Sequence, residues 1–255
     1  MTGMPMVRLA VIFLALAMAG CTGDNARKMA EAEAEAQRRV LVFTKTTDYR
    51  HESIAVGIAL VRRLGSAEGF AVDASEDATQ FRDDALRRYQ AVIFLSTSGD
   101  VLDADQEAAF KSFIQRGGGF VGVHAAAVTE MAWPWYGQLL GARFLSHPPT
   151  QNAELRVVDT AHASTRGLPN PWRRNDEWYD FDTDPARVAR VLVEIDETSY
   201  RGGVMGPRHP ISWAHEFDGG RAWYTGMGHT EESYAEPAFE QHLLGGIRWA
   251  AGWAR

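Results

Sequence analysis

Short apolar runs alternate with helical patterns over the first half of the chain, and this alternation constrains the fold more than any other feature. The apolar runs, which predict buried strands, are 40–43, 70–72, 91–95 and 120–123. The segments between them that predict helices are 54–65, 82–88 and 103–116. Strands that are apolar on both faces and separated by helices form a parallel sheet covered on both sides. The first half therefore predicts an α/β fold.

The second half of the chain is richer in strand patterns. The strands predicted there are 153–158, 188–195, 210–217 and 221–225, and a last helix is predicted over 237–253. The loops rich in Pro, Gly, Trp and Arg are 146–151, 167–184 and 198–207. Ligands of open α/β sheets bind in loops beyond the carboxyl ends of the strands, so we expect a site among such loops.

The first 20 residues have the composition of an export signal. Arg8 precedes an apolar run over residues 9–19, which is shorter than the roughly 20 residues that span a bilayer. The run ends in LAMAGC, residues 16–21, which resembles a bacterial lipobox. Cys21 is therefore predicted to be the lipid-bearing first residue of the mature protein. An ordinary signal peptide with a chance cysteine is the alternative.

This leader predicts three parts of the chain: a signal peptide over 1–20, a tether over 21–39 and a globular domain over 40–255. The tether is rich in Ala and Glu and has no apolar stripe to bury, which is typical of a solvated spacer. The expected location is the bacterial cell envelope. There the lipid on Cys21 would hold the domain to a membrane, facing the periplasm or the cell exterior.

Composition excludes two classes of function. The net charge is −7, from 26 basic and 33 acidic residues, and no run of Lys and Arg exceeds two, so we expect no nucleic-acid partner. The single cysteine excludes an intrachain disulfide and a cysteine-based zinc site. Neither observation predicts an oligomeric state.

Four of the eight histidines follow predicted strands. His51 lies in the loop after the first strand, and His124 comes directly after the fourth. His215 ends the strand predicted over 210–217, and His229 follows the strand over 221–225. If these strands are parallel neighbours, their loops meet at one edge of the sheet, and we expect the histidines to share a pocket there. His162 and His242 are predicted to be structural.

The order of these motifs resembles that of the ThuA-like (trehalose utilisation) family over about residues 40–253. The motifs are an Arg50-His51 loop, GGGFVGVH over 117–124, NDEWY over 175–179, HPISW over 209–213, GRAWYT over 220–225, GHT over 228–230 and GGIRW over 245–249. The resemblance implies a flavodoxin-like fold, similar to class I glutamine amidotransferases, with helices on both faces of a parallel sheet and β-rich additions in the second half. It also implies a link to sugar metabolism, especially that of disaccharides.

The comparison with amidotransferases argues against glutaminase activity. Those enzymes carry a nucleophilic cysteine on the sharp turn after a central strand, where this chain has His124. The only cysteine lies in the leader, so no thiol is available at the turn. The small residues around His124 fit a tight turn that would present its side chain to solvent.

The first functional hypothesis is an enzyme that acts on a small sugar or sugar derivative by acid–base chemistry. The catalytic candidates are His51, His124, His229 and Glu177, because His and Glu exchange protons with hydroxyl groups near neutral pH. The substrate-binding candidates are Arg50, His147, Trp178, Tyr179 and His215. Trp135 is a further aromatic face on which a sugar ring could stack.

Two other hypotheses use the same residues. A metal-assisted enzyme would hold a divalent metal such as zinc among His51, His124, His229 and Glu177, since three imidazoles and a carboxylate suit that ion. A non-catalytic lipoprotein would bind a sugar or a partner with the same pocket. Removal of metal with a chelator separates the metal hypothesis from the other two.

Overall fold

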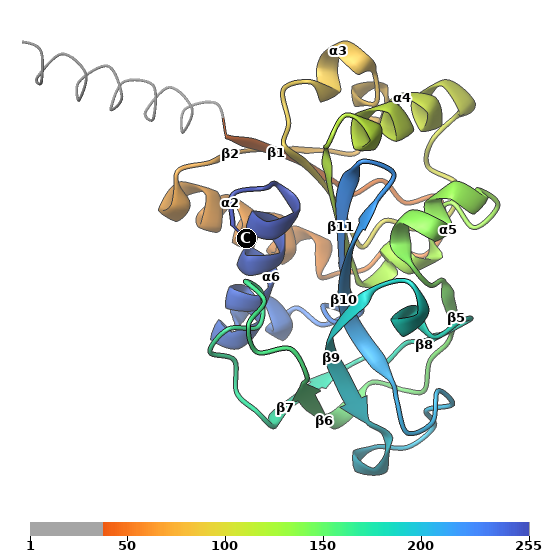
Figure 1. The fold of residues 1–255 in the computed structure, drawn as a ribbon, viewed down its shortest axis with the longest axis vertical. Coiled ribbons are helices and arrows are strands. Elements are labelled where there is room, and N and C mark those ends of the chain that lie inside the picture. Colours follow the sequence, from red (N-terminus) through yellow and green to blue (C-terminus); the bar gives the residue numbers. More distant parts are fainter. Residues whose placement is uncertain (1–37, 255) are drawn as a thin grey trace, which may run out of the picture. The chain divides into compact units, whose positions relative to one another are not determined.

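A computed structural model describes residues 38–254. The predicted signal peptide, Cys21 and nearly all of the predicted tether lie outside the described residues. Nine strands form one sheet in the order β2-β1-β3-β4-β11-β10-β9-β6-β7, and β5 pairs with β8 in a small second sheet (Figure 1). The described part of the chain has no helix that is both long and apolar enough to cross a bilayer.

Most of the predicted elements are present. The strands are β1 (Arg39–Phe43), β2 (Ala71–Ser75), β3 (Ala91–Leu95), β4 (Gly119–Val123), β5 (Phe144–Ser146), β6 (Gln151–Val157), β7 (Trp172–Asp176), β8 (Asp180–Phe181), β9 (Arg190–Asp196), β10 (Pro210–Phe217) and β11 (Gly220–Thr225). The α-helices are α2 (Ile54–Glu68), α3 (Asp83–Leu86), α4 (Ala104–Gln115), α5 (Pro134–Leu140) and α6 (Pro237–Ala250). Short 3-10 helices include η2 (His124–Val128) and η5 (Glu232–Ala235).

The pairing of the strands changes once across the large sheet, from parallel to antiparallel. The five strands from β2 to β11 are mutually parallel, whereas β10, β9, β6 and β7 each pair antiparallel with their neighbours. This confirms the predicted α/β fold with a parallel half and β-rich additions. The carboxyl ends of β1, β4 and β11 share one edge, while β10 ends at the opposite edge.

Helices cover both faces of the parallel half. The helices α2 and α6 pack on one face, and α3, α4 and α5 lie on the other (Figure 1). Phe94 on β3 stacks on Phe110 of α4 with ring centroids 5.2 Å apart, and both rings are fully buried. Burial of such aromatic side chains supplies the main stabilisation of the sheet.

Two helices end at different residues from those predicted. The helix α2 continues past Gly65 and ends at Glu68. The next residue, Gly69, has a φ of 74°, the left-handed conformation that glycine adopts readily at the end of a helix. Gly65 lies inside the helix, at a position where a Cβ atom would come within 2.6 Å of the Phe70 carbonyl oxygen. The last helix, α6, ends at Ala250 rather than near Trp253.

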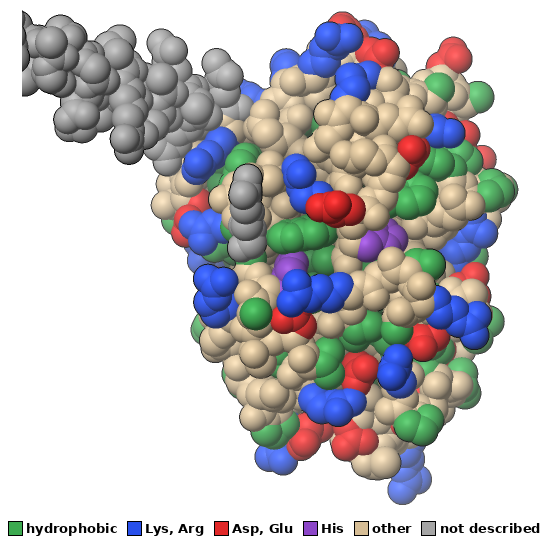
Figure 2. All heavy atoms as spheres, in the orientation of Figure 1, with side chains coloured by type: hydrophobic (Ala, Val, Ile, Leu, Met, Phe, Trp, Pro, Cys, Tyr) green, Lys and Arg blue, Asp and Glu red, His purple; other side chains and the backbone are tan. Residues whose placement is uncertain are grey.

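Four elements were absent from the sequence-based description: α5, β5, β7 and β8. The strand β7 lies inside the segment 167–184, which was expected to be a loop. As an edge strand its exposed face is polar, so it lacks the apolar run of a buried strand. In Figure 2, Arg and acidic side chains are interspersed over the face shown rather than gathered by sign.

Candidate functional site

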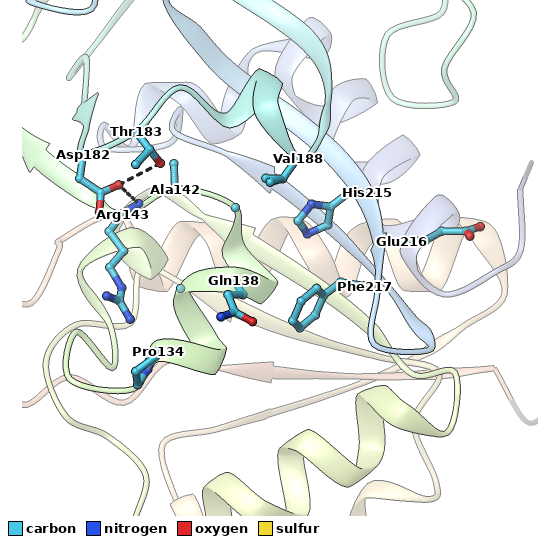
Figure 3. A pocket seen from close by; sticks show the side chains of 12 residues that line it. Pro134, Gln138, Ala142, Arg143, Asp182, Thr183, Val188, His215, Glu216 and Phe217 are labelled. Carbon is cyan, nitrogen blue, oxygen red and sulfur yellow. Dashed lines mark hydrogen bonds between the residues drawn. The ribbon is translucent and has the colours of Figure 1, made fainter.

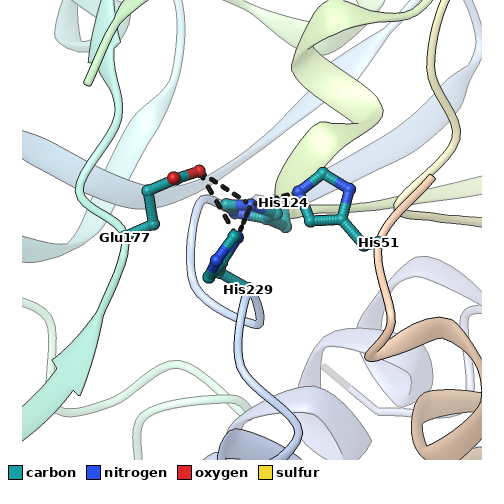
Figure 4. Close-up of side chains that lie close together, drawn as sticks. All are labelled: His51, His124, Glu177 and His229. Atoms are coloured by element: carbon teal, nitrogen blue, oxygen red, sulfur yellow. Dashed lines mark hydrogen bonds and ion pairs between the residues drawn. The ribbon is translucent and has the colours of Figure 1, made fainter. Parts of the chain in front are cut away.

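Four side chains converge at the carboxyl edge of the parallel strands: His51, His124, Glu177 and His229 (Figure 4). His51 lies in the loop after β1, His124 directly follows β4, Glu177 follows β7 and His229 follows β11. One nitrogen or oxygen atom from each residue lies within 4.8 Å of the corresponding atom of every other. The structure therefore brings together all four catalytic candidates.

His124 occupies the sharp turn after β4. Its φ of 50° lies in the left-handed region, which a non-glycine residue adopts at a cost of roughly 1–3 kcal/mol. The side chain is fully buried rather than presented to solvent, which corrects the expectation from sequence. The cause is Tyr179, whose ring packs against the imidazole with centroids 4.3 Å apart.

The tautomer of His124 follows from its partner on the next strand. Its Nδ1 atom lies 2.8 Å from the Gly226 carbonyl oxygen, which can only accept a hydrogen bond, so Nδ1 carries the proton of the neutral ring. The Nε2 atom then presents its lone pair to the other three residues. It lies 3.1 Å from His51 Nε2, 3.3 Å from His229 Nδ1 and 3.4 Å from Glu177 Oε2.

The environment lowers the pKa values of His51, His229 and Glu177, which favours neutral imidazoles at the first two and an ionised carboxylate at the third. Burial, and then the charges of His124, His229 and His147, lower the pKa of His51 to about 2. Burial and the charge of His124 also lower the pKa of His229. Burial raises the pKa of Glu177, but hydrogen bonding and attraction to the histidines outweigh it, so that pKa is lowered. These protonation states are the ones that bind a metal ion.

Two cavities give access to the cluster. The larger, of about 400 Å³, is lined by Asp48, Tyr49, His51, Ser98, Val128, Phe144, His147, Glu177, Tyr179 and His229. A second cavity of about 240 Å³ shares Tyr49, His51 and His229 with the first. The larger volume lies in the range of small-molecule sites.

His147 and Tyr179 lie where a ligand in the larger cavity would touch them. His147 is partly exposed, and its Nδ1 atom lies 3.0 Å from Glu177 Oε1. Tyr179 lines the cavity, although most of its ring is buried against His124 and Phe144. The aromatic residues Tyr49 and Phe144 also line the cavity and were missed from sequence, because neither belongs to a chemically distinctive motif.

Two aromatic candidates lie elsewhere. Trp178 is fully buried, and its Nε1 atom donates to the Gln151 carbonyl oxygen at 2.9 Å, so no ligand reaches its face. Trp135 lines neither cavity and donates to Asp218 at 2.9 Å. Both placements correct the expectation that these rings stack on a sugar.

Arg50 also lies away from the cluster. Its guanidinium pairs with Glu76 at 2.6 Å, its side chain is 48% exposed, and it lines neither cavity. The expected contact with substrate is therefore corrected as well.

His215 lies at the opposite edge of the sheet because β10 is antiparallel to β11. Its Nε2 atom lies 2.8 Å from the Leu139 carbonyl oxygen. There it lines a separate cavity of about 470 Å³, where His215 and Phe217 face Gln138 of α5 (Figure 3). Only Asp218 and Gly219 separate the two strands, a link that permits an antiparallel hairpin but no parallel crossover, so the prediction that His215 joins the other histidines is wrong.

Asp176, at the end of β7, is a buried residue of the site that sequence reasoning missed. Its Oδ1 atom accepts hydrogen bonds from the backbone N–H groups of Glu177 at 2.9 Å and His229 at 3.0 Å. The signal was present in the sequence, because Asp176 directly precedes Glu177 in the NDEWY motif.

A second group of acidic and histidine side chains lies beside Tyr179. It consists of Asp180, Glu197 and His209. Glu197 Oε1 accepts hydrogen bonds from two backbone N–H groups and lies 2.9 Å from His209 Nδ1, while His209 Nε2 lies 2.8 Å from the Tyr179 carbonyl oxygen. These contacts tie the segment 197–209 to Tyr179 and so support the wall of the larger cavity.

Solved structures that share this fold include two ThuA-like proteins and part of a larger enzyme. A ThuA-like protein from Bacteroides uniformis is 23% identical, with a TM-score of 0.72 over 84% of this chain and 91% of its own. A ThuA-like protein from Parabacteroides merdae is 22% identical, with a TM-score of 0.71 over 85% of this chain and 91% of its own. A β-galactosidase from Rahnella sp. R3 is 17% identical, with a TM-score of 0.58 over 92% of this chain but only 35% of the enzyme.

Sequence comparison gives the family. No curated protein matches the chain at a significant level. The sequence profile of the ThuA family, described as trehalose utilisation, matches residues 39–250. This match covers the strands of the large sheet and all four converging residues. The chain therefore belongs to the ThuA (trehalose utilisation) family.

Proposed function

We propose that this chain is a metal-dependent enzyme that acts on a sugar or sugar derivative. A divalent ion such as zinc is held by His51, His124, Glu177 and His229, and the substrate occupies the cavity of about 400 Å³ beside them. The family supports a role related to trehalose utilisation. The bound metal and its role in the reaction are proposed beyond what the family match supports.

Four of the six distances among the four ligand atoms carry the proposal, and the other two are at most 4.8 Å. A tetrahedral zinc site with bonds of about 2.0–2.1 Å needs ligand atoms about 3.3–3.4 Å apart. His124 Nε2 lies 3.1, 3.3 and 3.4 Å from the atoms of His51, His229 and Glu177, and the last two atoms lie 3.4 Å from each other. One lone pair on His124 cannot accept hydrogen bonds from all its neighbours, whereas a cation between them satisfies every atom.

The residues around the cluster supply the rest of the chemistry. A divalent ion held by these four residues would polarise an oxygen atom of the substrate if its coordination expanded to include that atom. Glu177 Oε1 lies 3.0 Å from Nδ1 of His147, which is partly exposed and so able to exchange a proton with solvent. Tyr49, Phe144 and Tyr179 offer ring faces to the apolar face of a sugar.

A second candidate is acid–base catalysis without metal. The observation that favours it is the Glu177–His147 contact of 3.0 Å, which joins a buried carboxylate to a partly exposed imidazole. In that mechanism Glu177 takes a proton from a sugar hydroxyl and His147 passes it to solvent. A binding module without turnover would use the same cavity.

Metal analysis of the purified full-length protein separates these functions. The proposal expects about one zinc-class ion per chain, lost on chelation and on His124→Asn substitution, but retained in His215→Gln, a histidine in the other cavity. Turnover of trehalose or a related disaccharide that persists after complete metal removal supports acid–base catalysis instead. Trehalose binding without turnover, whatever the metal content, supports the binding module.

We also propose that the protein works at the bacterial cell envelope. The support is the lipobox-like sequence over residues 16–21, which ends at the only cysteine of the chain. The substrate cavity would then meet sugars in the periplasm or outside the cell.

A further inference from the structure

One buried carboxylate connects two of the proposed metal ligands. Asp176 is fully buried, and its Oδ1 atom accepts the backbone N–H groups of Glu177 and His229 at 2.9 and 3.0 Å. Its Oδ2 atom accepts the Gly228 N–H at 2.9 Å and lies 3.3 Å from Ser233 Oγ. Both oxygen atoms of the carboxylate therefore accept hydrogen bonds from the backbone beside the cluster.

The sheet alone would not bring these ligands together. Glu177 follows β7 at the edge of the sheet, while His229 follows β11, and the strands β10, β9 and β6 lie between them. Gly228 has a φ of 108°, a conformation suited to glycine, and this turn directs the next N–H toward Asp176. The two segments meet through Asp176 rather than through a ladder of strand hydrogen bonds.

A buried cation holds Asp176 in this orientation. Arg174 Nη2 lies 3.0 Å from Asp176 Oδ2, and the Arg174 side chain is only 3% exposed. Its guanidinium lies over the rings of Trp172 and Phe239, with centroid distances of 5.1 and 4.8 Å. Such a pair gives little net stability, because both charges lose hydration, but it restricts the geometry of the carboxylate.

We propose that Asp176 is the positioning residue of the metal site: it sets the distance between Glu177 and His229. This inference rests on the proposed function. Asp176 touches neither metal nor substrate and acts only through the backbone of its two neighbours. Without the two carboxylate oxygens of Asp176, the N–H groups of Gly228 and His229 lose their acceptors. The turn that carries His229 then shifts, and the distance of 3.4 Å between His229 Nδ1 and Glu177 Oε2 changes. Loss of an outer partner of this kind typically lowers metal affinity about 10–100-fold.

Substitution of Asp176→Asn tests the inference, because the amide keeps the shape but offers only one acceptor oxygen. The probe is Co²⁺, whose visible absorption reports coordination, titrated into the metal-free full-length protein. We expect about a 10–100-fold weaker affinity and an altered Co²⁺ spectrum. The control is Asp159→Asn, which breaks the Arg190 ion pair away from the cluster and should leave both readouts unchanged.

A second variant guards against misfolding. In Arg174→Gln/Asp176→Asn no buried charge is left unpaired, so folding is retained more readily. Weaker Co²⁺ binding in this variant supports the inference, and wild-type affinity with a wild-type spectrum in either folded variant overturns it.

Crystal structures of the metal-free variants give a test that does not need a metal. We expect the distance between Glu177 Oε2 and His229 Nδ1 to depart from 3.4 Å. An unchanged distance overturns the positioning role even if the wild-type protein proves to bind no metal. Failure of the wild-type protein to bind Co²⁺ or zinc overturns the proposed function instead.

Discussion

The Nδ1 atom of His124 lies 2.8 Å from the carbonyl oxygen of Gly226, and this contact decides which nitrogen faces the cluster. Because the carbonyl oxygen accepts a hydrogen bond from the protonated Nδ1, the Nε2 atom of the neutral ring is left as an acceptor or a metal ligand. Gly226 directly follows β11, the strand that pairs with β4, so neighbouring parallel strands supply both the proposed ligand and its outer partner. Such partners orient a histidine and raise its basicity toward a metal.

His124→Asn should abolish metal binding while preserving the fold. Asn adopts the left-handed φ of 50° more readily than other non-glycine residues, so the turn after β4 is retained. Its shorter side chain does not reach the position of Nε2. We expect a loss of zinc affinity greater than the 10–100-fold typical of an outer partner. Metal content and thermal unfolding check this, with His124→Ala predicted to be the less stable variant because Ala is strained at this φ.

Trp178→Ala should lower the free energy of unfolding by about 3–5 kcal/mol, the cost of removing a fully buried tryptophan. Trp178→Phe should cost less, because most of the packing volume is kept. Urea unfolding measures both effects. If Trp178→Phe instead weakened trehalose binding with no change in stability, the ring would have to contact ligand, contrary to its place in the core.

His242 should make the protein less stable in acid. Burial lowers its pKa to about 3, against 6.5 for an ordinary histidine. The unfolded chain therefore takes up a proton as the pH falls below 6.5, whereas the folded chain does so only near pH 3. The contribution of His242 to the free energy of unfolding is complete above pH 6.5. As the pH falls from 6.5 to 3, this contribution declines by at most about 5 kcal/mol.

Urea unfolding of the wild type and of His242→Gln at pH 7 and 4.5 measures this contribution. The wild type should lose more stability between the two pH values, by about 3 kcal/mol at most. The same loss in both proteins would contradict the assignment. His162, whose pKa burial lowers to about 4, accounts for part of the acid sensitivity left in the variant.

Cys21→Ala should release the protein from membranes, because residues 38–254 contain no helix suited to span a bilayer. Fractionation of cells into membrane and soluble parts measures this, and mass spectrometry of the wild type should find lipid on Cys21. An alanine variant that is processed but still bound to membranes would contradict the anchor.

The parallel half of the site was predictable because parallel neighbouring strands end at the same edge of a sheet. His51, His124 and His229 each follow a strand that joins the parallel sheet, and the rule that such loops share an edge places them together. The motif resemblance added Glu177. Its neighbour Trp178 was misplaced, since hydrophobicity alone does not separate a buried ring from one that faces a cavity.

The antiparallel half was less predictable for physical reasons. His215 was expected at the wrong edge because the hairpin signal of Asp218 and Gly219, which makes β10 antiparallel to β11, was overlooked. The strand β7 was hidden because an edge strand buries only alternate residues. The role of Asp176 depends on a turn 52 residues away, a contact that local patterns cannot reveal.

The cluster draws its members from distant parts of the chain: His51 and His124 are 73 residues apart, and His229 follows His124 by another 105. Loop closure over such lengths is slow, and these contacts form only when the long-range strand pairings exist. No nascent chain shorter than 229 residues contains the complete set. Metal binding would therefore report the completion of folding. An ion that binds only the folded state would also stabilise that state against unfolding by mass action.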